Sequence, residues 1–341
     1  MFRLFCLANG LTVIRYYLAS LTMDYFLSCD WGTTFLRVRL VDIKQKKVLL
    51  EEASFDGILN TFNSWQQTGK PDGQPRTDFY LAKIAGCIKE LEPRIGSPLG
   101  GVKIIISGMA SSSAGFVTVS YAGVPLSTDG SGLKTAIIKA NDQFRHDCLV
   151  ISGVKTNDDI MRGEETQLIG CTDRVKNGLF IFPGTHSKHI RVRDDQITGF
   201  KTYMTGEFFE LLSRSSILKN SVKASTPDDS NLQVFKKGVQ DAVRENLLHS
   251  AFTVRVNDLF DIFTRQQNFA YLSGLVIGTE LKDMLAEHAE TVNLISAPHL
   301  SPWYCAALDE LGIKYAFSAN AADKATVQGH VKIGRLFKFI P

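Results

Sequence analysis

The stretch Asp30-Trp31-Gly32-Thr33-Thr34 decides how the rest of this sequence is interpreted. An apolar, β-prone run, Tyr25–Cys29, precedes it and an alternating run over 36–41 follows it, which predicts a strand, a tight turn and a second strand. Glycine lets the backbone approach an anion closely, and the two threonines offer hydroxyls and amides to phosphate oxygens. An aspartate at a strand end can hold a metal-bound water. The pattern favours a phosphate-binding hairpin over an ordinary Gly-Thr turn.

A second run of the same kind occurs later, as Pro183-Gly184-Thr185-His186-Ser187-Lys188 between two further strand patterns. Its Gly184 and Thr185 repeat the Gly-Thr pair, and Ser187 and Lys188 add a hydroxyl and a cation. Two such hairpins, one at the head of each half of the chain, could clamp a polyphosphate between two lobes. The alternative is a polar turn.

The composition is that of a globular protein, with 341 residues, 44% of them hydrophobic and 21% charged. This length is sufficient for about two domains. The net charge of +3 is too small to indicate a nucleic-acid partner, and no apolar run is long enough to span a membrane. The six cysteines form no CxxC pair, so we expect reduced thiols and a cytoplasmic protein.

The first residues, 1–22, match neither a signal peptide nor a membrane span, because Asn9-Gly10 and Arg15 interrupt the apolar run. We interpret them as an upstream-start extension, with Met23 as the natural start. A weak export signal or a docking helix are the alternatives.

Strand and helix patterns alternate along the chain, which is typical of α/β architecture. Strands are expected at Tyr25–Cys29, Leu36–Asp42, Lys47–Ala53, Val102–Ser107, Cys148–Ser152, Gly178–Phe182, His189–Arg193, Gln196–Thr202 and Thr291–Ser296. Helices are expected at Asp78–Glu90, Gly132–Asn141, Ile160–Cys171, Gly206–Leu212, Asp228–Ser250, Asn257–Arg265, Phe269–His288, Pro302–Leu311 and Asn320–Lys332. The domain boundary is expected at 174–178, which gives lobes of residues 23–177 and 178–341, with the last helix able to pack back on the first lobe.

Two segments of the first half carry residues suited to chemistry. The small-residue loop that begins at Ser107-Gly108-Met109 follows an apolar strand, where open α/β sheets bind ligands. The run Asn157–Gln167 is the densest polar cluster and is expected to open a helix. Within it, Asp159 or Glu164 could accept a hydroxyl proton and Arg162 could hold an anion. A flexible loop and simple helix capping are the respective alternatives.

Two segments of the second half are less specific. Tyr203–Glu210 is a strand-to-helix transition with Thr205 as a possible cap, and a plain helix start explains it equally well. In Leu272–Glu280, Gly274 and Gly278 indicate either a flat ring lying close or tight helix packing. No P-loop, dinucleotide fingerprint or protein-kinase motif is present in the sequence.

Together these motifs resemble the sugar-kinase, hsp70 and actin superfamily and, more narrowly, the 2-dehydro-3-deoxygalactonokinase family. The resemblance extends from about residue 24 to 334 and rests on Asp30-Trp31-Gly32-Thr33-Thr34, Ser107-Gly108-Met109, Asp159-Ile160-Met161-Arg162-Gly163-Glu164-Glu165-Thr166-Gln167, Pro183-Gly184-Thr185-His186-Ser187-Lys188, Met204-Thr205-Gly206-Glu207, Leu211-Leu212-Ser213-Arg214 and Leu272-Ser273-Gly274-Leu275. The chain differs from the family's forms at Ser111–Ser113 and Tyr121–Pro125, and His189 stands where tryptophan is expected.

The resemblance implies two ribonuclease H-like lobes with a nucleotide cleft between them, the actin-like ATPase fold. It implies a phosphotransferase with an alcohol acceptor, which uses ATP and Mg²⁺ to phosphorylate the 6-hydroxyl of 2-dehydro-3-deoxy-D-galactonate in galactonate catabolism. Catalysis is implied for Glu164, Asp159 and Asp30, with Asp30 holding Mg²⁺ through water. ATP or phosphate contacts are implied for Gly32, Thr33, Thr34, Gly184, Thr185, Ser187, Ser273 and Gly274, with the adenosine site in the second lobe. Substrate contacts are implied for Ser107, Gly108, Met109, Arg162, Lys188, Thr205 and Glu207.

Several alternatives stay open at this stage. The substrate could be a related 2-keto-3-deoxy sugar acid or another sugar. The same fold could serve as a non-catalytic nucleotide or sugar sensor, or as a phosphohydrolase that needs no sugar. The sequence does not choose between Asp159 and Glu164 as the base, and a homodimer is one open alternative for the oligomeric state.

Overall fold

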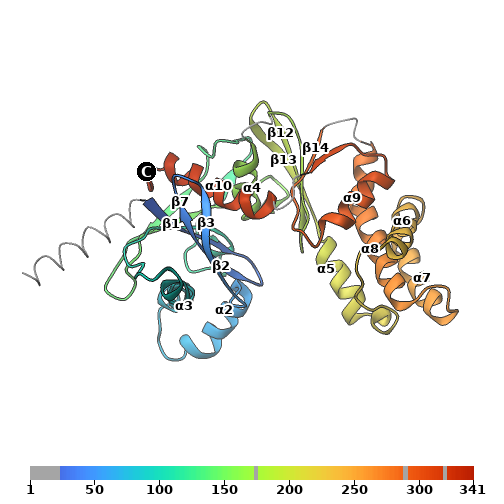
Figure 1. The fold of residues 1–341 in the computed structure, drawn as a ribbon, viewed down its shortest axis with the longest axis horizontal. Helices are drawn as coiled ribbons and strands as arrows, with labels where there is room; N and C mark the ends of the chain where they lie inside the picture. The colour runs from blue at the N-terminus through green and yellow to red at the C-terminus, as the bar shows by residue number, and fades with distance from the viewer. Residues whose placement is uncertain (1–23, 173–175, 287–290, 318–320) are drawn as a thin grey trace, which may run out of the picture. The chain divides into compact units, whose positions relative to one another are not determined.

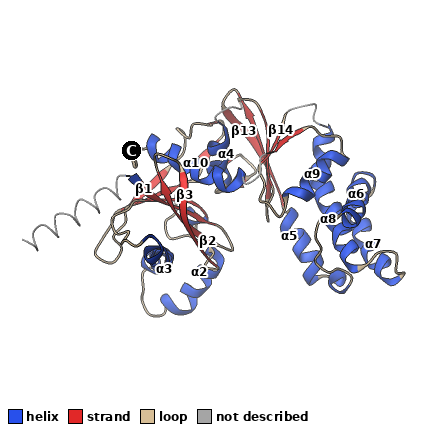
Figure 2. Cartoon of the chain, viewed as in Figure 1, coloured by secondary structure: helices blue, strands red, loops and turns tan. Residues whose placement is uncertain are grey.

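The structure is a computed structural model that describes residues 24–172, 176–286, 291–317 and 321–341. The expected extension 1–22, the expected start Met23 and residues 174 and 175 of the expected boundary lie outside the described residues. The chain forms two compact units: unit 1 comprises Met1–Arg174 with Lys324–Pro341, and unit 2 comprises Val175–Asp323. Figure 1 labels the elements along the chain, and Figure 2 distinguishes helix from strand. No described helix is both long enough and apolar enough to cross a membrane.

Unit 1 is built on a six-stranded sheet with the order β3-β2-β1-β4-β8-β7. Strands β1, β2 and β3 are antiparallel neighbours, β1, β4 and β8 run parallel, and β7 is antiparallel to β8. The central strands β1 and β4 are buried along almost their whole length, as is typical of parallel strands covered on both faces. The bounds are β1 Tyr25–Trp31, β2 Leu36–Asp42, β3 Lys47–Ser54, β4 Ile104–Gly108, β7 Thr135–Ile138 and β8 Cys148–Ile151.

Helices and short strands complete unit 1. Helix α3 packs its buried side chains, including Leu81 and Ile84, into the same apolar core as β1 and β4. Helix α10 lies against α4 at two glycines, because a methyl group on Gly170 would come within 1.9 Å of the Ala325 carbonyl oxygen and one on Gly329 within 2.0 Å of that of Thr166. The bounds are α2 Ile58–Ser64, η1 Trp65–Gly69, α3 Arg76–Ile95, η2 Met109–Ser111, β5 Ala122–Gly123, β6 Leu126–Ser127, β9 Val154–Lys155, β10 Ile160–Met161, α4 Glu164–Cys171 and α10 Ala321–Leu336.

Unit 2 repeats the strand arrangement of unit 1. Its strands lie in the order β15-β14-β11-β12-β13, with β11, β12 and β13 antiparallel and β11, β14 and β15 parallel. In both units a central strand therefore has an antiparallel meander on one side and parallel strands on the other. This repeat confirms the predicted fold class of two ribonuclease H-like lobes. The bounds are β11 Gly178–Phe182, β12 Ser187–Arg193, β13 Gln196–Tyr203, β14 Val292–Leu294 and β15 Tyr315–Phe317.

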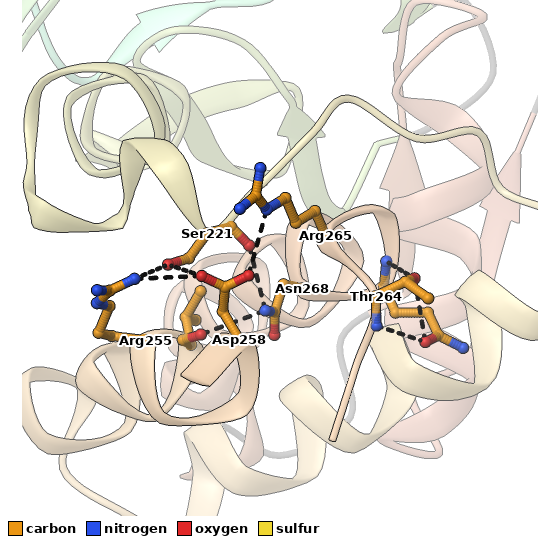
Figure 3. Close-up of polar contacts among 8 residues, drawn as sticks. Ser221, Arg255, Asp258, Thr264, Arg265 and Asn268 are labelled. Carbon is orange, nitrogen blue, oxygen red and sulfur yellow. Dashed lines mark hydrogen bonds and ion pairs between the residues drawn. The ribbon is translucent and has the colours of Figure 1, made fainter. Parts of the chain in front are cut away.

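The helices of unit 2 form a layer held by polar as well as apolar contacts. Figure 3 shows the carboxylate of Asp258 accepting hydrogen bonds from Ser221, Arg255 and Arg265, which joins α7 to the chain before it and to the start of α8. Helix α8 begins with a capping box formed by Thr264 and Gln267. The bounds are α5 Thr205–Glu210, η4 Leu211–Ser215, η5 Ile217–Asn220, α6 Asp229–Arg244, α7 Leu247–Leu259, α8 Arg265–Leu281, η6 Lys282–Ala286 and α9 Ser301–Glu310.

Helices α6 and α8 pack backbone against backbone through three glycines. A methyl group on Gly238 would come within 2.3 Å of the Tyr271 carbonyl oxygen, and one on Gly274 within 2.1 Å of that of Phe235. Gly278 faces the backbone of α6 in the same way, with the nearest atoms at 2.9 Å. Tight helix packing thus accounts for the glycines at 274 and 278.

The expected helix at Gly132–Asn141 is wrong, because Thr135–Ile138 forms edge strand β7 paired with β8. The β-branched pair Ile137-Ile138 is better suited to that pleated edge than to a helix. The helix expected at Ile160–Cys171 begins only at Glu164, because residues 160 and 161 pair with β9 and Gly163 adopts φ +106°.

The boundary expected between the helices Asp228–Ser250 and Asn257–Arg265 is also wrong. Helix α6 ends at Arg244, and a new helix, α7, begins at Leu247 and continues to Leu259. The side chain of Asn246 caps α7 by accepting a hydrogen bond from the amide of Leu248. The ends of two other expected helices, at His288 and Asn320, lie outside the described residues.

We expect Gly274→Ala to lower the melting temperature by several degrees, because overpacking at a rigid backbone contact costs about 1–3 kcal/mol or more. The matched control is Gly86→Ala in α3, where a methyl group would meet nothing within 4 Å. That control should stabilise the protein by about 0.5–1 kcal/mol through helix propensity. Thermal unfolding by circular dichroism measures both, and equal melting temperatures for the two variants would contradict the packing explanation.

Candidate active site

The first hairpin, Gly32–Thr34, is fixed by the start of helix α2. The amide of Gly57 donates to the carbonyl oxygen of Thr34 at 3.2 Å, and those of Ile58 and Leu59 donate to the carbonyl oxygens of Gly32 at 3.0 Å and Thr33 at 3.3 Å. The contact requires glycine at 57, because a methyl group there would come within 2.2 Å of the backbone of Thr34. The loop carbonyls are thus occupied, while the side chain of Thr33 is half-buried and that of Thr34 is exposed. The two threonines therefore remain accessible on a backbone that is held by hydrogen bonds.

The ends of strands β1 and β4 bring three of the predicted residues together. Parallel pairing aligns Asp30 with Ser107 and Trp31 with Gly108. Gly108 adopts φ +85°, and a methyl group there would come within 2.6 Å of the Trp31 carbonyl oxygen. The Ser107 hydroxyl is buried and has no hydrogen-bond partner among the described residues. A buried hydroxyl in this state is suited to a ligand or an ordered water.

Helix α4 begins against this strand end. A methyl group on Gly163 would come within 3.5 Å of the Gly108 Cα, so the backbone before Glu164 passes directly over the end of β4. Glu164, the first residue of α4, is half-buried there. Asp30, Ser107, Gly108 and Glu164 therefore come from three elements that meet at one edge of the unit 1 sheet.

Glu165, which was not selected from the sequence, holds the backbone of Gly163 where it passes the end of β4. Both of its carboxylate oxygens lie within hydrogen-bond distance of the Gly163 amide, at 2.9 and 2.8 Å, and its side chain is buried. Burial, with a smaller contribution from the charge of Glu164, raises the pKa of Glu165 to about 8. Its position in the first turn of a helix gave no signal that it would be buried while its neighbour is not.

Asp159 lies on a different element from Glu164. It belongs to the turn between β9 and β10, where its carboxylate accepts a hydrogen bond from the amide of Ile160 at 2.7 Å and its own amide donates to the hydroxyl of Thr156. Asp159 thus lies in a turn before β10, whereas Glu164 is the first residue of α4. Of the two, Glu164 has the position next to the end of β4.

Arg162 holds the loop that follows β4. Its guanidinium donates to the hydroxyls of Tyr121 and Ser111 and to the Val119 carbonyl oxygen, and it stacks 4.0 Å from the centre of the Tyr121 ring. Tyr121 and Ser111 lie in the two loops that were expected from the sequence to differ from the family's forms. Met109 opens the 3₁₀ turn η2 of this same loop. The role of Arg162 toward a substrate carboxylate stays a prediction.

The second hairpin is held by the start of helix α5. The amide of Glu207 donates to the Thr185 carbonyl oxygen at 3.0 Å, and a methyl group on Gly206 would come within 2.7 Å of the Gly184 carbonyl oxygen. The side chains of His186 and Glu207 pair at 2.5 Å on the surface. As in unit 1, a helix start orders the loop while a threonine side chain, here that of Thr185, stays exposed.

Three of the other predicted residues of unit 2, Ser187, Lys188 and Thr205, are buried. The hydroxyls of Ser187 and Thr205 donate to the buried carboxylate of Glu280 at 2.7 and 2.5 Å. Lys188 is buried and donates to the His186 carbonyl oxygen at 3.0 Å. Ser273 lies on α8 one residue before the packed Gly274. Ligand contacts for these residues stay predictions, and the described residues contain no group of three or more histidine, cysteine or acidic side chains suited to a metal.

The repeated strand order and the two Gly-Thr hairpins place the chain in the sugar-kinase, hsp70 and actin superfamily. The family model described as 2-keto-3-deoxy-galactonokinase matches residues 30–333, and the chain belongs to that family. The resemblance deduced from the motifs is thus confirmed, and so is the class of enzyme, a phosphotransferase that acts on an alcohol.

Individual relatives support the same family. The chain is 30% identical over 319 residues to a Rhizobium meliloti (strain 1021) protein named as a probable 2-dehydro-3-deoxygalactonokinase, with 89% of this chain and 95% of that protein covered. It is 29% identical over 311 residues to the 2-dehydro-3-deoxygalactonokinase of Escherichia coli (strain K12), with 89% and 93% covered. A crystal structure from Sinorhizobium meliloti, of a candidate 2-dehydro-3-deoxygalactonokinase, superposes with a TM-score of 0.77 at 27% identity and covers 91% of this chain and 96% of that one.

We expect Glu165→Gln to change how stability depends on pH. The folded state raises the pKa of Glu165 from 4.5 to about 8, so the unionised form favours folding at low pH. That contribution is full below about pH 4.5 and is lost as the pH rises to about 8. The free energy of unfolding of the wild type, relative to Glu165→Gln, should therefore fall across this range. Urea unfolding at pH 5 and pH 8 measures it, and a constant difference would contradict the assignment.

Proposed function

We propose that this protein transfers the γ-phosphoryl group of ATP to the 6-hydroxyl of 2-dehydro-3-deoxy-D-galactonate. The observation that carries the proposal is the convergence of Asp30, Ser107, Gly108 and Glu164 at the carboxyl ends of parallel strands in unit 1. The names of the relatives support the choice of substrate. Because the reaction consumes ATP, we place it in the cytoplasm.

Glu164 is the proposed general base. Its carboxylate is half-buried beside the end of β4, where it could accept the proton of the attacking hydroxyl. Asp159 is the alternative, held in its turn by bonds to Ile160 and Thr156. Phosphoryl transfer depends mainly on positioning and charge neutralisation, so the base need not contribute the largest part of the rate.

Asp30 is the proposed Mg²⁺ ligand, through a water molecule. A carboxylate beside a buried, unpartnered serine hydroxyl offers the oxygen donors that Mg²⁺ prefers. When bound, Mg²⁺ would neutralise charge on the phosphate groups of ATP. Asp30 would orient that site from the rigid end of β1 while the hairpin next to it contacts phosphate.

The remaining proposed contacts fall into three groups. The half-buried or exposed hairpin residues, Gly32, Thr33, Thr34, Gly184 and Thr185, would bind the phosphates. Ser187, Ser273 and Gly274 would line the nucleotide site, with adenosine on unit 2. The sugar acid would contact Ser107, Gly108, Met109, Arg162, Lys188, Thr205 and Glu207, of which Arg162 orders the loop carrying Ser111 and Tyr121.

Coupled ADP release over a panel of aldonates and 2-keto-3-deoxy sugar acids tests the proposal. We expect sustained ADP release with 2-dehydro-3-deoxy-D-galactonate and Mg-ATP, and none from Asp30→Ala folded to the same extent. ADP release with a different sugar acid only would show that this other sugar acid is the substrate. Phosphate release without any sugar acid would indicate a phosphohydrolase, and ATP binding without turnover would indicate a sensor.

Glu164→Gln and Asp159→Asn distinguish the two candidate bases. We expect Glu164→Gln to lower kcat by at least about 10²-fold with little change in the KM for ATP, because only the proton acceptor is removed. Asp159→Asn should lose far less. The control is Asp158→Asn in the same turn, whose exposed carboxylate bonds only Thr156 among the described contacts. A large loss in Asp159→Asn with normal turnover in Glu164→Gln would reverse the assignment.

A further inference from the structure

Glu280 is a buried carboxylate with four hydrogen-bond donors around it. Its side chain is 2% exposed and lies on α8. One oxygen accepts from the Ser187 hydroxyl at 2.7 Å and contacts the His189 Nε2 at 2.8 Å. The other accepts from the hydroxyls of Thr205 at 2.5 Å and Tyr304 at 2.7 Å. A buried charge is tolerated only when it is paired and hydrogen-bonded, and this one satisfies that condition on both oxygens.

Two of these donors frame the second hairpin. Ser187 is the first residue of β12, directly after the loop, and Thr205 is the first residue of α5. The start of α5 in turn contacts the loop, through the Glu207 amide on the Thr185 carbonyl oxygen. Glu280 therefore joins the strand that leaves the hairpin to the helix that supports it.

The charge state of Glu280 follows from this environment. Burial alone would raise its pKa, but the hydrogen bond and charge of His189, with the bonds from Thr205 and Ser187, outweigh burial and lower the pKa. As an ionised carboxylate, Glu280 acts as an acceptor only, which suits four donors directed at it. His189, which stands where the family was expected to have tryptophan, supplies one of those donors and stacks on Tyr203 with ring centres 4.6 Å apart.

We propose that Glu280 is a positioning residue for the phosphate-binding loop of unit 2, which holds Gly184 and Thr185 in the conformation that receives the phosphates of ATP. This rests on the proposed function, in which the second hairpin binds phosphate. Glu280 itself lies too deep to touch the nucleotide, so its effect passes through Ser187 and Thr205. In the structure the hydroxyls of both residues donate to the carboxylate of Glu280.

Tyr304 offers a matched control within the same network. It bonds the same carboxylate oxygen as Thr205 but comes from α9, which does not contact the hairpin through any described hydrogen bond. Tyr304→Phe keeps the ring in the core and removes one donor from Glu280. A purely structural role would make Glu280→Gln and Tyr304→Phe differ in stability alone, whereas a positioning role predicts that only the former weakens nucleotide binding.

The experiment measures the affinity for Mg-ADP by calorimetry, the KM for ATP and the melting temperature of the wild type, Glu280→Gln and Tyr304→Phe. We expect Glu280→Gln to weaken Mg-ADP binding about tenfold or more and to raise the KM for ATP in parallel, from the loss of charged hydrogen bonds. Tyr304→Phe should lower the melting temperature and bind Mg-ADP within about twofold of the wild type. Equal Mg-ADP affinities for the two folded variants would overturn the proposal.

His189→Phe is the second variant if Glu280→Gln does not fold. It keeps the aromatic contact with Tyr203 and removes both the donor and the charge that face Glu280, so we expect about threefold weaker Mg-ADP binding. Wild-type affinity in this variant would overturn the role of Glu280. If the wild-type protein binds Mg-ADP but does not phosphorylate the sugar acid, the proposed substrate is overturned. The role of Glu280 is then decided by the Mg-ADP affinities of the variants alone. Wild-type protein that binds no nucleotide would overturn both.

Discussion

Close contact between a glycine at the start of a helix and a Gly-Thr hairpin is the constraint on which the hairpin of each unit depends. In unit 1 Gly57 lies against the backbone of Thr34, and in unit 2 Gly206 lies against that of Gly184. Any side chain at either position would push the helix away from the loop. The same solution appears in both units because a tight loop can be ordered by helix amides that occupy its carbonyl oxygens.

The consequence of this contact is a preordered loop. A loop that is already fixed loses less conformational entropy when phosphate binds, so more of the contact energy is available for affinity and alignment. Unit 1 adds a second close contact, between Gly163 and Gly108, which brings the first turn of α4 over the end of β4. Glu165 accepts the hydrogen bond of the Gly163 amide in that position, and Glu164, the next residue after Gly163, begins α4 beside the strand end.

Local patterns predicted the fold well where neighbouring residues decide the structure. The bounds expected for β2 and β11 agree with the structure, because alternating or apolar runs end at clear turns. Contacts between residues that are distant in the sequence could not be predicted from local patterns. Glu280 lies 75 to 93 positions from its hydroxyl donors Thr205 and Ser187, and helix α2 with Gly57 left no pattern in a short, mixed segment. The error at Thr135–Ile138 has the same origin, since only pairing with β8 makes that segment a strand.

The residues of the predicted phosphate motifs fall into an accessible group and a buried group, which the sequence alone does not distinguish. Thr33, Thr34 and Thr185 keep their side chains half-buried or exposed, whereas Ser187 and Thr205 are buried against a carboxylate. A hydroxyl committed to a buried charge cannot turn to a ligand without leaving that charge short of a donor, which costs about 1–3 kcal/mol. The predicted phosphate motif therefore includes residues whose side chains remain accessible and residues whose hydroxyls are bonded inside the protein. In this chain the second group is anchored on one carboxylate from a helix distant in sequence.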